Sequence, residues 1–200
     1  MVDANSMRVM QTLADATNVI AEGEVLQLMN MHDASLDEEG YLRVIRSKTA
    51  KLFEASARLG PILAGSPPEI EAACAHYGQA LGTAFQVIDD VLDYDGNSAE
   101  MGKNLGDDLR EGKATLPLIL AMQRGNPEQS RTVREAIETG NVDRLNDIVA
   151  IVRDTGALAA TRSAAAAEAQ RAIDAAMQLP DNTYRTAMVA LASQLLDRRT

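Results

Sequence analysis

The chain has 200 residues, with 19 basic and 29 acidic side chains and a formal net charge of −10. This acidic balance argues against a general nucleic-acid-binding protein, which would present a basic face. No apolar run is long enough to span a bilayer, and the first residues lack the basic and apolar regions of a signal peptide, so we expect a cytoplasmic protein. Cys74 is the only cysteine, so no intramolecular disulfide can form, and we expect it to be a small buried residue on a helix.

The secondary-structure signals along the chain are helical. Aromatic residues are scarce, and runs of β-branched and aromatic residues bounded by turns are absent, so the sequence predicts an all-α fold. Residues 7–31 are predicted to form one long helix. Its apolar residues fall on more than one side, which favours a central place in a helical bundle.

Two candidate capping motifs open the next helices. Ser35 is predicted to be an N-cap, with Glu38 as the third residue of the helix. This helix ends near Pro61, or kinks there and continues to Gly65. Ser66 is predicted to cap the following helix, which runs to about residue 94.

A polar segment separates these helices from the rest of the chain. Residues 95–113 are rich in Gly, Asn and Asp, which predicts a loop with at most a short helical turn, and loops of this length are often functional. Asn126, Asn141 and Asn182 are predicted to open three of the helices that follow. The five predicted helices cover residues 115–124, 127–139, 141–155, 157–179 and 182–197. Because no repeat or long linker divides the chain, we expect a single helical domain over residues 1–200.

The DDxxD cluster Asp89, Asp90 and Asp93 is set among apolar residues of a predicted helix. Asp89 and Asp93 are four residues apart and share a face with Gln86, while Asp90 can lean toward them. The stripe therefore presents oxygen ligands in a row, and Mg²⁺ is usually held by one or two carboxylates together with phosphate oxygens. The alternative is a solvated acidic face, which the apolar flanks disfavour, because buried carboxylates need a cation or hydrogen bonds.

Basic residues on both sides of the cluster indicate a partner for an anionic group. Lys48 and Thr49 lie on the preceding helix, where the ammonium and the hydroxyl can both donate to a phosphate. Lys103 and Lys113 each follow a glycine in the polar segment. The alternative for these lysines is an ordinary solvated surface position.

Other titratable residues carry weaker signals. Asp107 and Asp108 are interpreted as loop and cap residues, with a second acidic contact as the less favoured alternative. His32 and His76 lack the spacing of metal ligands, and we expect both to be ordinary surface or core histidines.

The segments FQVIDDVLD, GKNLGDDLREGKATLPL and SKTA are similar to the trans-polyprenyl diphosphate synthases. The stretches AEGEVLQLMN and SKTAKLFEASARLGPILAG resemble the long-chain branch of that family. The resemblance covers essentially the whole chain and is most specific over residues 85–117. It implies an isoprenoid-synthase-type helical bundle around a deep central cavity, usually in a homodimer.

The resemblance also implies an activity. Family members condense isopentenyl diphosphate head-to-tail onto an allylic diphosphate, here farnesyl diphosphate or longer, and the long-chain products serve as quinone side chains. Mg²⁺ ions bridge two aspartate-rich motifs and the allylic diphosphate, which stabilises the leaving group.

Matches to the family motifs assign roles residue by residue. Asp89, Asp90 and Asp93 match the second aspartate-rich motif, with Asp89 as the first choice of metal ligand and a catalytic residue. Lys48 and Thr49 match the pair that meets the allylic diphosphate and stabilises the cation. The further matches to substrate-binding positions are Gln86, Lys103, Lys113, Gln27 and Glu24.

One departure from the family pattern is large. The first aspartate-rich motif, and the glycine-lysine-arginine segment that binds isopentenyl diphosphate, lie upstream of the helix that opens this chain. We therefore expect the C-terminal portion of a synthase, inactive alone, with exposed apolar surface on its first helix.

Three alternatives remain open. The main one is a catalytically silent helical subunit, or short homologue, that dimerises with a full-length synthase. A terpene cyclase fits less well, because such enzymes usually carry an Asn/Ser/Glu-type motif at the position of this DDxxD. The plainest is a helical scaffold with a solvated acidic patch.

Overall fold

The computed structural model describes residues 4–95 and 105–196, and within them all regular structure is helical, as predicted. The elements are α1 (Met7–Met29), α2 (Glu38–Ile45), the π-helix η2 (Arg46–Ala50), α3 (Lys51–Ala64), α4 (Pro68–Leu92), α5 (Asp107–Arg110), α6 (Leu116–Arg124), α7 (Pro127–Thr139), α8 (Leu145–Asp154), α9 (Ala157–Ala176) and α10 (Thr183–Leu195).

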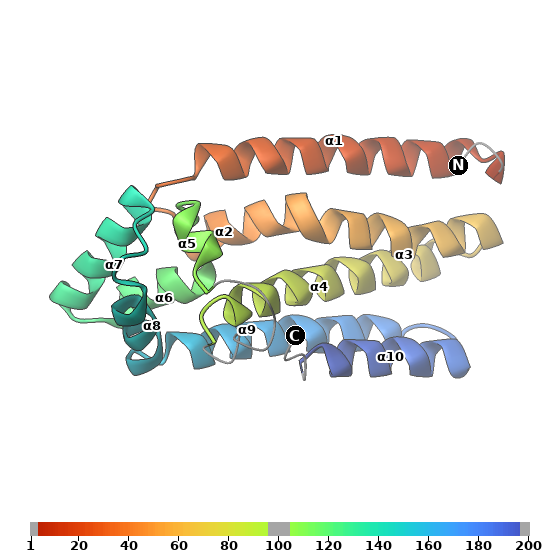
Figure 1. Ribbon diagram of the computed structural model, residues 1–200. Helices are drawn as coiled ribbons and strands as arrows, with labels where there is room; N and C mark the ends of the chain where they lie inside the picture. Colours follow the sequence, from red (N-terminus) through yellow and green to blue (C-terminus); the bar gives the residue numbers. More distant parts are fainter. Residues whose placement is uncertain (1–3, 96–104, 197–200) are drawn as a thin grey trace.

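The long helices lie side by side, and the short ones gather at one end of the molecule. Figure 1 shows α1 along one outer edge and α9 and α10 along the opposite edge, with α5 to α8 at the same end as the C-terminus of α1. Helix α4 packs against α3 on one side and α9 on the other. The DDxxD cluster ends α4, so it lies where the long helices meet the short ones.

Helix α4 is the buried centre of the bundle. Most of its residues after Ala72 are buried, including Cys74, which confirms the predicted position of the cysteine. Val87 and Ile88 are almost completely buried and join a core that extends to Leu118, Ile137 and other apolar residues of the short helices. This core fixes the C-terminal part of α4 against α6, which in turn packs on α7, because close-packed apolar side chains resist displacement.

The prediction of a central first helix is wrong for these residues, because α1 lies at the edge. Only Val9, Ala16 and Gly23 of α1 are buried. Leu28 and Met29 are 63% and 75% exposed, so the expectation of apolar surface on this helix is confirmed. No helix within residues 4–95 and 105–196 is both long and apolar enough to cross a membrane.

Three of the predicted helix starts are displaced. Ser35 is not an N-cap, because its hydroxyl donates to Asp33 at 2.6 Å, and Asp37 caps α2 instead by accepting from the Gly40 N–H at 2.8 Å. At α4 the N-cap is Pro67, one residue after Ser66, and no side chain caps the helix.

The third displaced start is α8. Asn141 accepts from the Asp143 N–H at 2.6 Å in a turn, so the helix begins only at Leu145. In contrast, α3 continues through Pro61 and ends at Gly65, which has a φ of 63°. This is the second of the two outcomes considered for that helix.

Asn126 caps α7 as predicted, in a reciprocal arrangement. Its side chain accepts from the Glu128 and Gln129 N–H groups at 3.0 Å, and its own N–H donates to Gln129 Oε1 at 2.9 Å. We expect Asn126→Ala to lower the free energy of unfolding by about 1 kcal/mol, measured by urea denaturation. Asn141→Ala is the matched control, and an equal loss in both variants would contradict the cap assignment.

Candidate functional site

A pocket of about 260 Å³ lies where α1, α2, η2, α4 and the segment after α5 meet. Its polar lining residues are Gln27, Asn30, Tyr41, Lys48, Thr49, Gln86, Asp89, Asp90, Asp108, Lys113 and Thr115. Seven of the ten residues predicted for the site therefore meet here, from segments up to 86 residues apart in the chain (Gln27 to Lys113). Of the other three, Glu24 and Asp93 lie outside the lining, and Lys103 lies outside the described residues.

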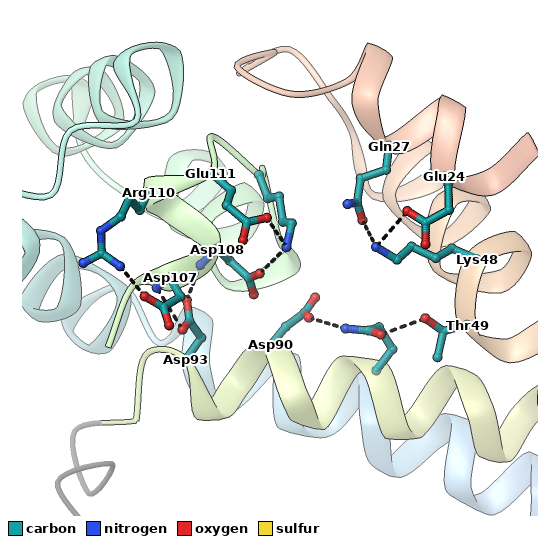
Figure 2. A network of polar contacts seen from close by, with 12 residues as sticks. Glu24, Gln27, Lys48, Thr49, Asp90, Asp93, Asp107, Asp108, Arg110 and Glu111 are labelled. Atoms are coloured by element: carbon teal, nitrogen blue, oxygen red, sulfur yellow. Dashed lines mark hydrogen bonds and ion pairs between the residues drawn. The ribbon is translucent and has the colours of Figure 1, made fainter. Parts of the chain in front are cut away.

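One wall of the pocket holds an ammonium group between two α1 side chains. Lys48 Nζ lies 3.2 Å from both Gln27 Oε1 and Glu24 Oε2 (Figure 2). Glu24 therefore contributes through Lys48, although it does not line the pocket. Since the pairing carboxylate is half exposed, it orients Lys48 more than it stabilises the fold.

Lys48 and Thr49 lie on the π-helix η2, which the sequence did not predict. Two glycines allow neighbouring helices to approach this segment closely. A Cβ on Gly23 would lie 2.6 Å from the Lys48 backbone nitrogen, and one on Gly82 would lie 2.7 Å from Ala50 Cα. Single π-turns inside α-helices often occur at functional sites, and this one lies where two predicted ligand-binding residues face the same pocket.

The opposite wall contains a buried carboxylate in a hydrogen-bonded network. Asp90 is 2% exposed and accepts from Tyr41 Oη at 2.7 Å and from Gln86 Nε2 at 2.9 Å. Gln86 Oε1 in turn accepts from Thr49 Oγ1 at 2.8 Å. Burial, and secondly the charge of Asp108, raise the pKa of Asp90 to about 8, because both disfavour its ionised form.

Asp93 does not line the pocket, although the sequence places it in a row with Gln86 and Asp89. It is the C-cap residue of α4, and its two oxygens accept from the backbone N–H groups of Asp107 and Asp108 at 3.2 Å (Figure 2). Burial, and secondly the charge of Asp108, raise its pKa to about 7. These contacts join the end of α4 to the start of α5, so Asp93 positions the segment that carries Asp108 and Lys113.

Asp108 is the acidic residue that the sequence interpretation undervalued. It lines the pocket and accepts from Lys113 Nζ at 2.9 Å, so the less favoured alternative of a second acidic contact gains support. Lys113 also pairs with Glu111 at 2.8 Å. Burial alone would lower the pKa of Lys113, but the bonds to Glu111 and Asp108 raise it above its ordinary value.

The two histidines lie outside the pocket lining, as expected. His32 Nδ1 lies 3.1 Å from the Ile137 carbonyl oxygen, which joins the end of α1 to α7. His76 lines a separate surface pocket beside Arg58 and Glu71.

The donor set suits a cation that shares its ligands with a phosphate. Within residues 4–95 and 105–196 no group of three or more His, Cys, Asp and Glu side chains is arranged to hold a metal alone. Asp89, Asp90 and Asp108 nevertheless line one pocket with two lysines. Mg²⁺ needs only one or two carboxylates when phosphate oxygens and waters complete its octahedral shell, so these residues fit an ion that binds with a diphosphate.

Curated proteins similar to this chain include long-chain polyprenyl diphosphate synthases. The octaprenyl diphosphate synthase of Escherichia coli (strain K12) is 50% identical over 199 residues, which are 99% of this chain and 62% of that protein. The all-trans-nonaprenyl-diphosphate synthase (geranyl-diphosphate specific) of Rhodobacter capsulatus is 43% identical over 198 residues, or 99% of this chain and 61% of that protein. The chain thus spans about three fifths of the length of these relatives.

Comparison with solved structures gives the same fold. A polyprenyl synthase from Caulobacter crescentus CB15, crystallised with calcium and isoprenyl diphosphate, matches with a TM-score of 0.94 and 43% identity, over 100% of this chain and 62% of that one. A decaprenyl diphosphate synthase from Rhodobacter capsulatus matches with a TM-score of 0.92 and 44% identity over the same shares. The polyprenyl synthetase family model matches residues 1–152. The chain belongs to the polyprenyl synthetase family and has its all-α fold.

Proposed function

We propose that this chain is the allylic-diphosphate-binding part of a long-chain trans-polyprenyl diphosphate synthase. The proposed reaction joins isopentenyl diphosphate head-to-tail to farnesyl diphosphate or a longer allylic diphosphate, and its product supplies quinone side chains. The observation that carries the proposal is the single pocket in which Lys48 and Lys113 face Asp89, Asp90 and Asp108. Opposed ammonium and carboxylate groups are what a diphosphate and its divalent cation require together.

Each wall of the pocket has a separate task in this proposal. Lys48 and Lys113, with Lys103, bind diphosphate oxygens. Asp89 lines the pocket and is half-buried, so it is the first choice to hold Mg²⁺, with Asp90 and Asp93 completing the aspartate-rich motif. A bound Mg²⁺ would supply positive charge that stabilises the departing diphosphate.

The remaining residues orient these groups. Glu24 and Gln27 hold Lys48 in the pocket wall, and Gln86 holds Thr49. The Thr49 and Gln86 oxygens are then placed to face positive charge that develops on the allylic carbon. A cytoplasmic location, a homodimer and a single domain over residues 1–200 remain predictions of the same proposal.

A chimera tests the function. The part of the E. coli octaprenyl diphosphate synthase that precedes its match to this chain would be joined to Met1. We expect Mg²⁺-dependent incorporation of labelled isopentenyl diphosphate into polyprenyl products. Asp89→Ala in the chimera should lower the rate on the order of 100-fold, as the loss of one group that stabilises developing charge does elsewhere.

The matched control is Asp147→Ala, which removes an exposed aspartate on α8 that pairs only with Arg144 among the contacts described. Equal rates in the Asp89 and Asp147 variants would contradict the proposal. A silent chimera that still changes the rate of an added full-length synthase would instead favour the catalytically silent subunit.

A further inference from the structure

Tyr41 belongs to the hydrogen-bonded network of the pocket, and the proposed function gives it no task. It comes from α2, is 3% exposed, and packs its ring in the main apolar core. Its hydroxyl donates to Asp90 Oδ2 at 2.7 Å across a sequence separation of 49 residues. A buried hydroxyl that reaches a buried carboxylate over such a distance in the chain links two separately placed helices.

The network has the same direction from Asp90 to Thr49 whether Asp90 is ionised or carries its proton on Oδ2, the oxygen that faces Tyr41. The Tyr41 hydroxyl is hydrogen-bonded to Oδ2 of Asp90. The other oxygen, Oδ1, accepts from the Gln86 amide nitrogen at 2.9 Å. The Gln86 carbonyl oxygen therefore faces η2, where it accepts from Thr49 at 2.8 Å. Figure 2 shows Asp90 and Thr49 joined in this way through one intervening side chain of α4.

The direction of the network decides what Thr49 presents to the pocket. A threonine hydroxyl has one hydrogen and two lone pairs. Since the hydrogen is donated to Gln86, the oxygen offers only lone pairs to a ligand. If the Gln86 amide turned over, Thr49 would have to accept from it and would then donate its hydrogen elsewhere.

We propose that Tyr41 is a positioning residue that holds the Asp90 carboxylate so that Gln86 and Thr49 both present oxygen atoms to the pocket. Without the Tyr41 hydroxyl, Asp90 loses one of its two donors and can rotate. Gln86 is then no longer held in one amide orientation, and Thr49 loses its fixed acceptor. Groups that orient direct ligands in this way are typically worth 10- to 100-fold in affinity or activity elsewhere.

Tyr41→Phe tests this proposal, because it keeps the buried ring and removes only the hydroxyl. Tyr77→Phe is the matched control: Tyr77 is also buried, and its hydroxyl donates to the Met188 carbonyl oxygen at 2.9 Å, away from the pocket. The first readout is the side-chain amide NMR signal of Gln86 in the 200-residue chain, assigned by its loss in Gln86→Glu. We expect a shift of this signal in Tyr41→Phe and none in Tyr77→Phe.

The second readout is the affinity for farnesyl diphosphate in the presence of Mg²⁺, measured by calorimetry, and this readout alone rests on the proposed function. We expect binding on the order of 10-fold weaker in Tyr41→Phe and unchanged binding in Tyr77→Phe. An unchanged Gln86 signal in Tyr41→Phe, with only a loss of stability like that of Tyr77→Phe, would overturn the positioning role. If the unmodified chain fails to bind farnesyl diphosphate, the proposed function is in question, and the Gln86 signal still decides the role of Tyr41.

Discussion

Gly78→Ala is expected to lower the free energy of unfolding by about 3 kcal/mol, at the upper end of what overpacking in a core usually costs. A Cβ at this position would lie 2.3 Å from the Phe53 carbonyl oxygen and 2.8 Å from Glu54 Cα. Both are backbone atoms of α3, so no side-chain rotation relieves the contact. The helices α3 and α4 would have to separate, which opens gaps in an otherwise close-packed interface.

Gly60→Ala is the control for this prediction. Gly60 also lies within α3, and apart from its two chain neighbours and its own helix backbone a Cβ there would meet no atom within 4 Å. Alanine has a better helix propensity than glycine, but its Cβ would crowd the ring of the next residue, Pro61, so this variant should change the free energy of unfolding by less than about 1 kcal/mol. Urea denaturation of both variants measures the difference. A Gly78→Ala protein as stable as Gly60→Ala would show that α3 and α4 are not in this close contact.

Gly82→Ala extends the same prediction to the site. Its Cβ would lie 2.7 Å from Ala50 Cα and 2.9 Å from the Phe53 Cβ, so it displaces η2 away from α4. Thr49 would then move away from Gln86. We therefore expect this variant both to lower the free energy of unfolding and to separate side chains that line the pocket. Gly78, one turn earlier, lies against α3 beyond the π-helix, so its replacement should affect stability more than the pocket.

The sequence predicted the helices whose ends depend on local hydrogen bonds. Asn126 and Asn182 each accept from N–H groups two and three residues later. The capping side chain and the N–H groups that it binds therefore lie within one helical turn. Ser35 failed as a cap for a similarly local reason, since Asp33 takes its hydroxyl and Asp37 is better placed. Such competition among neighbouring polar residues cannot be decided from residue type alone.

The parts of the site that the sequence missed depend on contacts between distant segments. The π-helix η2 lies between Gly23 of α1 and Gly82 of α4, and neither glycine is near Lys48 in the sequence. Asp93 was assigned to a row of ligands because it shares a helix face with Gln86 and Asp89. In the structure its carboxylate accepts instead from two backbone N–H groups at the start of α5, 14 and 15 residues further along the chain.

The chemistry of the site was easier to predict than its geometry. Carboxylates within an apolar helix, with lysines on both sides, need a cation or hydrogen bonds wherever they fold. The structure supplies the hydrogen bonds from Tyr41 and Gln86 to Asp90, and the sequence carries no sign of the Tyr41 contact, because one buried tyrosine resembles any other core residue.

The second large effect that we expect is a fall in stability between pH 5 and pH 8 in metal-free buffer. The pKa of Asp90 is raised from 3.8 to about 8, and that of Asp93 to about 7, by burial first and then by the charge of Asp108. The folded chain therefore keeps these protons up to pH 7 or 8, whereas the unfolded chain releases them near pH 4. Because the unfolded state binds fewer protons in this window, the contribution is fully present below pH 4 and is lost as the pH rises through the folded pKa values.

Each unit of pKa difference corresponds to about 1.4 kcal/mol, so the combined loss should be on the order of several kcal/mol. Groups whose pKa is lowered in the folded chain make it more stable as the pH rises, but this change occurs outside the range from pH 5 to pH 8. Asp33 and Glu71 have lowered pKa values, so their contributions are lost only as the pH falls through still more acidic values. The trend between pH 5 and pH 8 therefore belongs mainly to the buried aspartates at the end of α4.

Asp90→Asn isolates the larger part of this effect, because asparagine stays neutral throughout. We expect the free energy of unfolding, measured by urea denaturation at steps from pH 5 to pH 8, to fall less in Asp90→Asn than in the unmodified chain. Asp147→Asn, at an exposed position, should retain the original slope. Mg²⁺ with farnesyl diphosphate should also flatten the slope of the unmodified chain, since a cation beside these carboxylates favours their ionised form. Parallel curves for Asp90→Asn and Asp147→Asn would mean that Asp90 ionises normally in the folded protein, and that the pocket already supplies the positive charge that we assign to a bound ion.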